Sequence, residues 1–334
     1  SWVNPGPAQR DETWESYMQK GALTALEKVL EETGEKRANV VGYCIGGTLL
    51  ASALAWMAAK GDDRVRSATF FTSQTDFTDA GELQAFVDEE VVDTIAQASE
   101  EHGFLAAENM FGAFNSLRAN DLIWSFVINN YLMGKEPFPF DLLYWNSDST
   151  RMPAAMHSFY LRRMYQENKL VEPGGITLKG VKIDLSKVKV PACLISTRED
   201  HIAPWKATYS ATRLLGGPVH IILAGSGHIA GVVNPPILQK YQYWTNPGSV
   251  ENLDEWIEDP NGSFVGGFFS RGTKEGCDAS IDSHAPGYID YSLGTRCCLD
   301  PPWRWRLVRA TGPSCNACWR RRLGADWLAP ERWL

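Results

Sequence analysis

Short apolar runs alternate with segments of helical periodicity at the start of the chain. Residues 13–32 carry apolar side chains at helical spacing with an acidic face, and residues 46–59 keep that spacing without the charges. Residues 39–42 and 65–71 are apolar runs of strand length. Helices and strands that alternate at this spacing predict a mainly parallel α/β sheet.

The alternation stops between residues 76 and 190. Helix-like segments at 80–97 and 120–134 are separated there by aromatic stretches that proline interrupts. The strand and helix rhythm then resumes, with strands at 192–196 and 219–223 on either side of a helix. We therefore expect a first core segment, an inserted lid, a second core segment and a divergent tail, at residues 1–75, 76–190, 191–258 and 259–334.

One tight turn between a predicted strand and a predicted helix carries a cysteine. The turn is "GYCIGG", with Cys44 flanked by Gly42 and Gly46. In a nucleophile elbow the central residue has a strained backbone, and the flanking glycines avoid collisions between strand and helix. The amino-terminal end of the helix also favours a thiolate. The alternative is a small buried thiol in a glycine-rich turn, so the partners of Cys44 must decide.

The loops after the two later strands carry an acid and a histidine. Asp200 lies in "TREDHIAPW" and His228 in "AGSGHIAGVVNPP". Active sites of parallel sheets lie at the carboxyl ends of the strands, where all three residues are expected. We predict a triad in which His228 takes the proton of Cys44 and Asp200 orients the imidazole. Taken singly, Asp200 could instead cap the helix after Pro204, and His228 could be an ordinary loop residue.

Composition limits the remaining functional classes. The chain has 334 residues and a formal charge of −8, which does not favour nucleic acid or an acidic membrane as a partner. It contains no run of about 20 apolar residues and no leader-like start, so a soluble intracellular protein is expected. The cysteines before the tail are isolated, as in a reducing compartment.

Several motifs resemble one family of enzymes. "GYCIGGTLLASALAWMAAKG", "LRANDLIWSFVINNYLMG", "PFPFDLLYWNSDSTRMP", "REDHIAPW" and "GSGHIAGVVNPP" are similar to the catalytic domain of class I polyhydroxyalkanoate synthases, from Ser1 to about Glu258. The resemblance implies an α/β-hydrolase fold with an inserted lid, and the triad proposed above. It also implies polymerisation of short 3-hydroxyacyl-CoA substrates, a homodimer formed through the lid, and a cytoplasmic location at the surface of polymer granules.

The same resemblance points to three further residues. Arg118 in "LRAND" and His201 beside the predicted acid match positions linked to coenzyme A binding, and Asn168 in "YQENKL" matches a position near the product path. Arg118 could equally be a solvated or salt-bridged lid residue, and His201 a packing residue behind the triad.

The chemistry of a thiol suits this substrate class. An acyl group moves from coenzyme A to a cysteine with little change in bond energy, so the intermediate stays activated for attack by the 3-hydroxyl of another unit. The histidine serves as general base for that hydroxyl. Water must be excluded, and an aromatic lid could do this. The candidate aromatic residues are Phe104, Phe111, Trp124, Phe126, Phe138, Phe140, Tyr144 and Trp145.

The chain departs from the family pattern at both ends. It opens at "SWVNPGP", which in the family follows the first strands of the sheet, so those strands are expected to be missing. The amide of Ile45 is the one oxyanion donor that can be assigned. The tail is rich in arginine and tryptophan; "CNAC" has zinc-ligand spacing, but the adjacent pair Cys297 and Cys298 is poor ligand spacing. We expect no metal and no cofactor, and a disordered or out-of-frame tail.

Three functions remain open on the sequence. The favoured one is an acyltransferase that polymerises 3-hydroxyacyl-CoA and releases coenzyme A. The second is a cysteine-dependent hydrolase acting on a thioester or lactone. The third is an inactive protein that binds polymer granules.

Overall fold

The computed structural model describes most of the chain in two compact units, Ser1–Val232 and Val233–Leu334. The described residues are 2–106, 109, 112, 123–136, 150–234 and 241–245, with the backbone of 263–265, 296–300 and 304–308. Arg118 and five of the eight candidate lid aromatics lie outside them.

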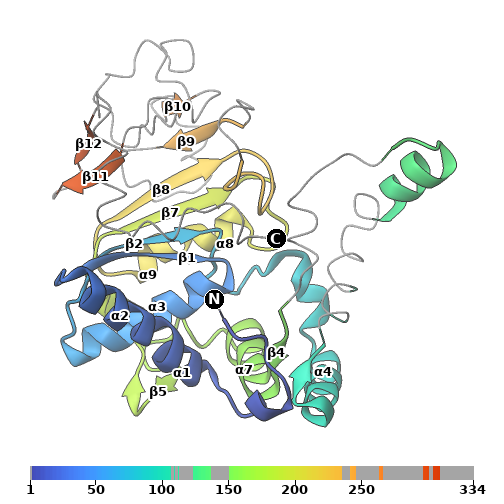
Figure 1. Cartoon of the computed structure of the whole chain (residues 1–334), viewed down its shortest axis with the longest axis horizontal. Helices are drawn as coiled ribbons and strands as arrows, with labels where there is room; N and C mark the ends of the chain where they lie inside the picture. The colour runs from blue at the N-terminus through green and yellow to red at the C-terminus, as the bar shows by residue number, and fades with distance from the viewer. Residues whose placement is uncertain are drawn as a thin grey trace. The chain divides into compact units, whose positions relative to one another are not determined.

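The first unit is built on four parallel strands, as predicted. In the order β1, β2, β7, β8 they are Ala38–Tyr43, Val65–Phe71, Ala192–Thr197 and Val219–Ala224. Their register aligns Phe70 with Gly42 on one side and with Leu194 on the other, and Leu194 with Ile221. Figure 1 shows the four strands side by side in one sheet. Each strand was predicted from the sequence to within one residue at either end.

The helices around this sheet follow the predicted segments. The first predicted helix runs without a break through three segments: α1 Trp14–Ser16, the π-helical segment η2 Tyr17–Leu23, and α2 Thr24–Thr33. It begins where the Thr13 hydroxyl accepts a hydrogen bond from the Ser16 amide. The helix after the cysteine is α3, Ile45–Lys60, and α8 Trp205–Tyr209 and α9 Ala211–Leu214 follow β7.

Helix α3 differs from the expectation of one apolar face. Consecutive residues from Gly47 to Leu49 and from Ala51 to Ala55 are buried, so the helix is enclosed nearly all round. Before its last residue, Lys60, the helix has no charged position and hence no polar face, which explains the difference. It is therefore a rigid support for the residue at its amino-terminal end.

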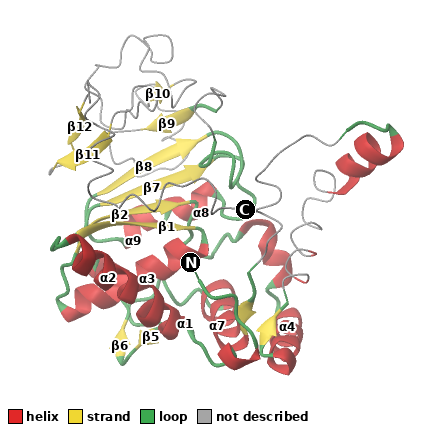
Figure 2. Ribbon diagram, viewed as in Figure 1, coloured by secondary structure: helices red, strands yellow, loops and turns green. Residues whose placement is uncertain are grey.

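Most of the regular secondary structure described between β2 and β7 is helical (Figure 2). The helices described there are η3 Gly81–Phe86, α4 Glu89–His102, η5 Val127–Leu132, α7 Ala154–Phe159, η6 Tyr160–Gln166 and η7 Leu185–Lys187. Two short antiparallel strand pairs accompany them: β3 Phe104–Leu105 pairs with β4 Met152–Pro153, and β5 Thr177–Leu178 pairs with β6 Val181–Lys182. The ring of Tyr160 stacks on that of Trp14 in the first helix, with 5.3 Å between centroids. The predicted lid boundaries stay a prediction.

The second unit contains two antiparallel pairs. Strand β9, Tyr243–Thr245, pairs with β10, Ser263–Val265, and β11, Arg296–Asp300, pairs with β12, Arg304–Val308. Cys297 and Cys298 fall in β11, whereas the cysteines of "CNAC" lie outside the described residues. No group of three metal-ligating side chains occurs in the described part of the chain. None of its helices is long and apolar enough to cross a membrane.

Candidate active site

Cys44 occupies a strained turn at the carboxyl end of β1. Its backbone has φ 52° and ψ −125°, which is unfavourable for a residue with a side chain. Hydrogen bonds hold this conformation from both sides: the Cys44 amide donates to the Phe71 carbonyl at 2.9 Å, and the Gly47 amide donates to the Cys44 carbonyl at 2.9 Å. The residue is thus fixed between the sheet and the start of α3.

Two glycines allow β1 and α3 to approach each other closely. They are Gly42 and Gly47, whereas the sequence motif predicted Gly42 and Gly46. A Cβ atom on Gly42 would lie 2.5 Å from the Gly47 Cα, and one on Gly47 would lie 2.0 Å from the Ser73 Oγ. A Cβ on Gly46 would meet nothing within 4 Å, so the expectation that Gly46 prevents a collision was wrong. The second contact falls one residue later because α3 turns Gly46 away from the sheet and towards the cavity described below.

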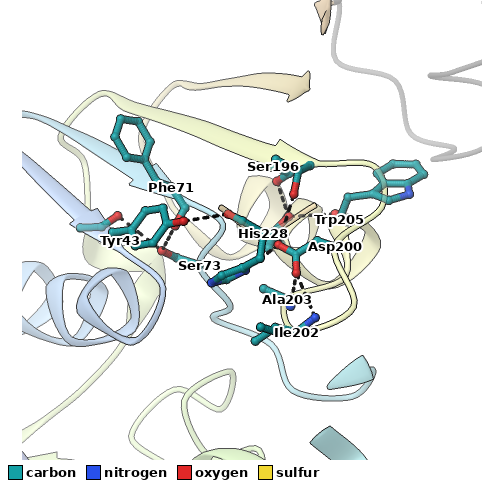
Figure 3. Close-up of polar contacts among 12 residues, drawn as sticks. Tyr43, Phe71, Ser73, Ser196, Asp200, Ile202, Ala203, Trp205 and His228 are labelled. Carbon is teal, nitrogen blue, oxygen red and sulfur yellow. Dashed lines mark hydrogen bonds and ion pairs between the residues drawn. The ribbon is translucent and has the colours of Figure 1, made fainter. Parts of the chain in front are cut away.

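Asp200 and His228 meet, although 28 residues separate them in the sequence. The distance between His228 Nδ1 and Asp200 Oδ2 is 2.8 Å, and both side chains are almost fully buried. Because a carboxylate only accepts hydrogen bonds, Nδ1 is the donor and Nε2 is left for another partner. The other carboxylate oxygen accepts from the amides of Ile202 and Ala203 at 2.9 and 2.8 Å, which fixes its orientation (Figure 3).

The imidazole of His228 is held in its charged form at neutral pH. Burial disfavours that charge, but the hydrogen bond with Asp200 and the favourable interactions with Cys44 and with the Asp200 carboxylate outweigh it and raise the pKa of His228 to about 10. The pKa of His228 therefore responds to Cys44 as well as to Asp200. All three residues of the predicted triad therefore lie in one connected group.

Cys44 lines a cavity of about 460 Å³ within the first unit. Ile45 and Gly46, at the start of α3, line it as well. The first amides of a helix have no partner within the helix, so the Ile45 N–H is available at this wall. Most of the remaining lining is aromatic or aliphatic. The first helix supplies Trp14 and Tyr17, and the segment between β2 and β7 supplies Leu83, Phe86, Val87, Ile95, Leu105, Met152, Met156, Tyr160, Leu161 and Tyr165. Trp2 before the first helix, Leu49 in α3 and Ile202 in the loop after β7 complete the apolar part.

The aromatic lining differs from the set expected from the sequence. Among the described candidates, Trp124 and Phe126 are 54% and 44% exposed, and neither they nor Phe104 line the cavity. Tyr160 and Tyr165 do. The helical spacing of apolar side chains from Met156 onwards could have indicated this face, but it gives no sign of which element the face contacts.

One polar side chain in the cavity was also missed. His157 lines it and is buried, and burial alone lowers its pKa to about 4. The imidazole is therefore neutral at physiological pH, so it adds no charge to the apolar wall.

Asn168 lies outside the described lining of this cavity. Its side-chain carbonyl accepts from the Phe77 amide at 2.9 Å, and its side-chain NH₂ donates to Asp76 Oδ1 at 2.8 Å and to the Thr78 hydroxyl at 3.1 Å. Its backbone φ is 49°, a left-handed conformation that asparagine tolerates. In this structure the residue joins the end of η6 to the loop that follows β2.

His201 also lies outside the cavity lining, next to the acid. Its backbone carbonyl accepts a hydrogen bond from the Glu82 amide at 3.1 Å, so it joins the loop after β7 to η3. Arg118 falls outside the described residues. A coenzyme A role for either residue stays a prediction.

Comparison with known proteins adds sequence relatives of named activity. A poly(3-hydroxyalkanoate) polymerase subunit of Rhizobium meliloti is 51% identical over 257 residues, covering 77% of this chain and 42% of that protein. The polymerase of Methylorubrum extorquens gives 51% over 258 residues, with 77% and 42% covered, and that of Cupriavidus necator 41% over 263 residues, with 77% and 44%. The chain thus spans less than half the length of these relatives. The predicted resemblance is confirmed.

A solved structure and a family model were matched to the chain as well. Among solved structures, a monoacylglycerol lipase from Paleococcus ferrophilus is 12% identical, with a TM-score of 0.36 over 65% of this chain and 67% of that one. The family model described as the alpha/beta hydrolase fold matches residues 1–235. With that match covering more than half of its length, the chain belongs to the α/β hydrolase fold family.

Proposed function

We propose that this chain carries the acyl-transfer site of an enzyme that polymerises 3-hydroxyacyl-CoA, with Cys44 as the nucleophile. The observation that carries the proposal is the position of Cys44: it lies at a strained turn, influences the pKa of the buried His228 that is paired with Asp200, and lines a mainly apolar cavity. The names of the relatives, poly(3-hydroxyalkanoate) polymerases, support this substrate class.

In the first step, the sulfur of Cys44 attacks the thioester carbonyl of the substrate. The charged imidazole of His228 stabilises negative charge on that sulfur before the attack. The Ile45 N–H donates to the oxyanion that forms as the new carbon–sulfur bond is made. The bond to coenzyme A then breaks, and the departing thiolate takes the proton of His228, which leaves the imidazole neutral.

In the second step, the 3-hydroxyl of another unit attacks the acyl group on Cys44. His228, now neutral, accepts the hydroxyl proton while the new ester bond forms and the carbon–sulfur bond breaks. The Cys44 thiolate and the charged imidazole are restored together. The carboxylate of Asp200 holds the ring in place through its Nδ1 hydrogen bond in both steps.

The apolar cavity supports transfer to a hydroxyl rather than to water. Its exposed lining is mainly apolar, although the polar residues Asn109, Thr150 and Arg151 also line it, so an acyl group on Cys44 would be largely shielded from hydrolysis. The apolar walls also suit the methylene and methyl groups of a short hydroxyacyl unit.

We further propose a homodimer formed through the lid, and attachment at the polymer granule in the cytoplasm. Apolar side chains between residues 123 and 133 are exposed, including Tyr131 at 84% and Leu132 at 68%. Exposed apolar clusters of this kind are typical of surfaces that contact another protein or an apolar phase.

The test is one assay on purified protein with 3-hydroxybutyryl-CoA. Release of coenzyme A together with insoluble polymer would support the proposal. Release with soluble 3-hydroxybutyrate would instead indicate a hydrolase, and no release would indicate a binding protein without this activity.

A further inference from the structure

The histidine has to reach across the sheet to meet the cysteine. Cys44 follows β1 and His228 follows β8, and these strands have β2 and β7 between them. Neighbouring strands lie about 4.8 Å apart, so three intervals separate the strand ends by roughly 14 Å. The loop that carries His228 must therefore cross the carboxyl edge of β7 and β2, and its position there depends on what holds it.

Contacts with the loop after β7 hold one side of the histidine loop. The Arg198 amide donates to the Ala224 carbonyl at 2.8 Å, and the Glu199 amide donates to the Ser226 carbonyl at 3.1 Å. The Asp200 side chain adds its hydrogen bond to the imidazole. These contacts fix the base relative to the acid, but they do not fix either of them relative to the nucleophile strand.

Tyr43 makes that second connection. It is the last residue of β1, and its hydroxyl donates to the backbone carbonyl of His228 at 2.7 Å (Figure 3). Its ring also lies against the imidazole, with 5.6 Å between centroids, and meets the ring of Phe71 edge-on at 6.2 Å. Burial raises the pKa of Tyr43 to about 12, so the phenol keeps the proton that it donates throughout the neutral range.

We infer that Tyr43 is a positioning residue for the reaction proposed above. Because Tyr43 directly precedes Cys44, its hydrogen bond to the His228 carbonyl sets the distance between the general base His228 and the nucleophile Cys44. The inference rests on the proposed roles of Cys44 and His228. Without the hydroxyl, the Asp200–His228 pair keeps its own geometry but is free to shift along the edge of the sheet, away from the cysteine.

The test compares Tyr43→Phe with the unaltered protein. Alkylation of Cys44 by iodoacetamide at pH 7 is followed by mass spectrometry, because it reports the reactivity of the thiol without any need for polymerisation. We expect alkylation to slow by about tenfold, the equivalent of one lost hydrogen bond, and kcat for coenzyme A release to fall with little change in KM. The thermal midpoint should fall by no more than about 4 °C, since the ring stays in place.

Phe71→Leu is the matched control. It changes the packing around the Tyr43 ring but leaves the hydroxyl in position, so Cys44 alkylation should change by less than about twofold. Equal rates for Tyr43→Phe and the unaltered protein, or equal losses in the two variants, would overturn the positioning role. If Cys44 of the unaltered protein reacted no faster than Cys193, the proposed function itself would fail instead.

Discussion

Cys44, in the turn after β1, and Cys193, within β7, differ in accessibility and in their neighbours. Cys193 lies within β7, and burial raises its pKa to about 12, so its thiol stays protonated and enclosed. Cys44 lines the cavity and influences the pKa of His228. We predict that Cys44→Ala abolishes coenzyme A release, whereas Cys193→Ala retains most of it. Labelling with an acyl-CoA analogue, located by mass spectrometry, checks this; modification of Cys193 in place of Cys44 would contradict it.

The adjacent glycines of the elbow make a second matched pair. We predict that Gly47→Ala lowers the free energy of unfolding by about 1 to 3 kcal/mol, because its Cβ would overlap Ser73. Gly46→Ala should be neutral or slightly stabilising, since alanine is favoured in a helix and the space is open. Urea unfolding of both variants decides. A larger loss for Gly46→Ala would mean that the turn is arranged differently.

The pKa of His228 predicts how stability depends on pH. An unperturbed imidazole titrates near 6.5, whereas His228 in the folded chain titrates at about 10. The folded state binds this proton more tightly, so its contribution to stability is complete below pH 6.5 and is lost as the pH rises through 10. Asp200→Asn removes one cause of the raised pKa, and we expect a shallower decline in the free energy of unfolding between pH 7 and 10. Urea unfolding at several pH values measures the slopes; identical slopes would contradict the prediction.

At the scale of elements, the contact between η6 and the loop after β2 supports the cavity wall. Asn168 binds the Phe77 amide, and the fully buried Phe77 ring packs against Tyr160 and Tyr165. We predict that Asn168→Ala lowers the free energy of unfolding by about 2 kcal/mol, because it leaves a buried amide without its partner. Lys169→Ala, next in sequence, removes only an exposed ion pair and should cost less than about 0.5 kcal/mol. Thermal or urea unfolding compares the two, and equal losses would contradict the assignment.

The elements themselves were largely predictable from the sequence, whereas their contacts were not. Strands such as Val65–Phe71 and the helix after Cys44 follow from local periodicity, because each alternates or repeats with its own period. The triad could be predicted because Cys44, Asp200 and His228 each lie in the loop that follows one of the predicted strands. The tyrosines that line the cavity and the role of Asn168 depend on which elements meet, and no local pattern specifies a contact across such distances in sequence.

At the scale of the whole molecule, the exposed apolar residues between 123 and 133, in the predicted lid, predict self-association. Leu132→Glu should shift the protein towards the monomer in size-exclusion chromatography with light scattering, because a charge on an apolar contact surface opposes burial. Alkylation of Cys44 should not change, because Leu132 does not line its cavity. An unaltered mass distribution would count against a dimer formed through this part of the lid.

The histidine is held from two sides, by Asp200 through its ring and by Tyr43 through its backbone. In the polymerisation proposed above, a base fixed in this way would stay in one place while the product lengthens. Every cycle must then bring a new hydroxyl to the same point, so the translocation between additions falls entirely to the growing chain and to the walls around it. In such an arrangement the rate of elongation would be governed by how fast the polyester slides past a stationary base.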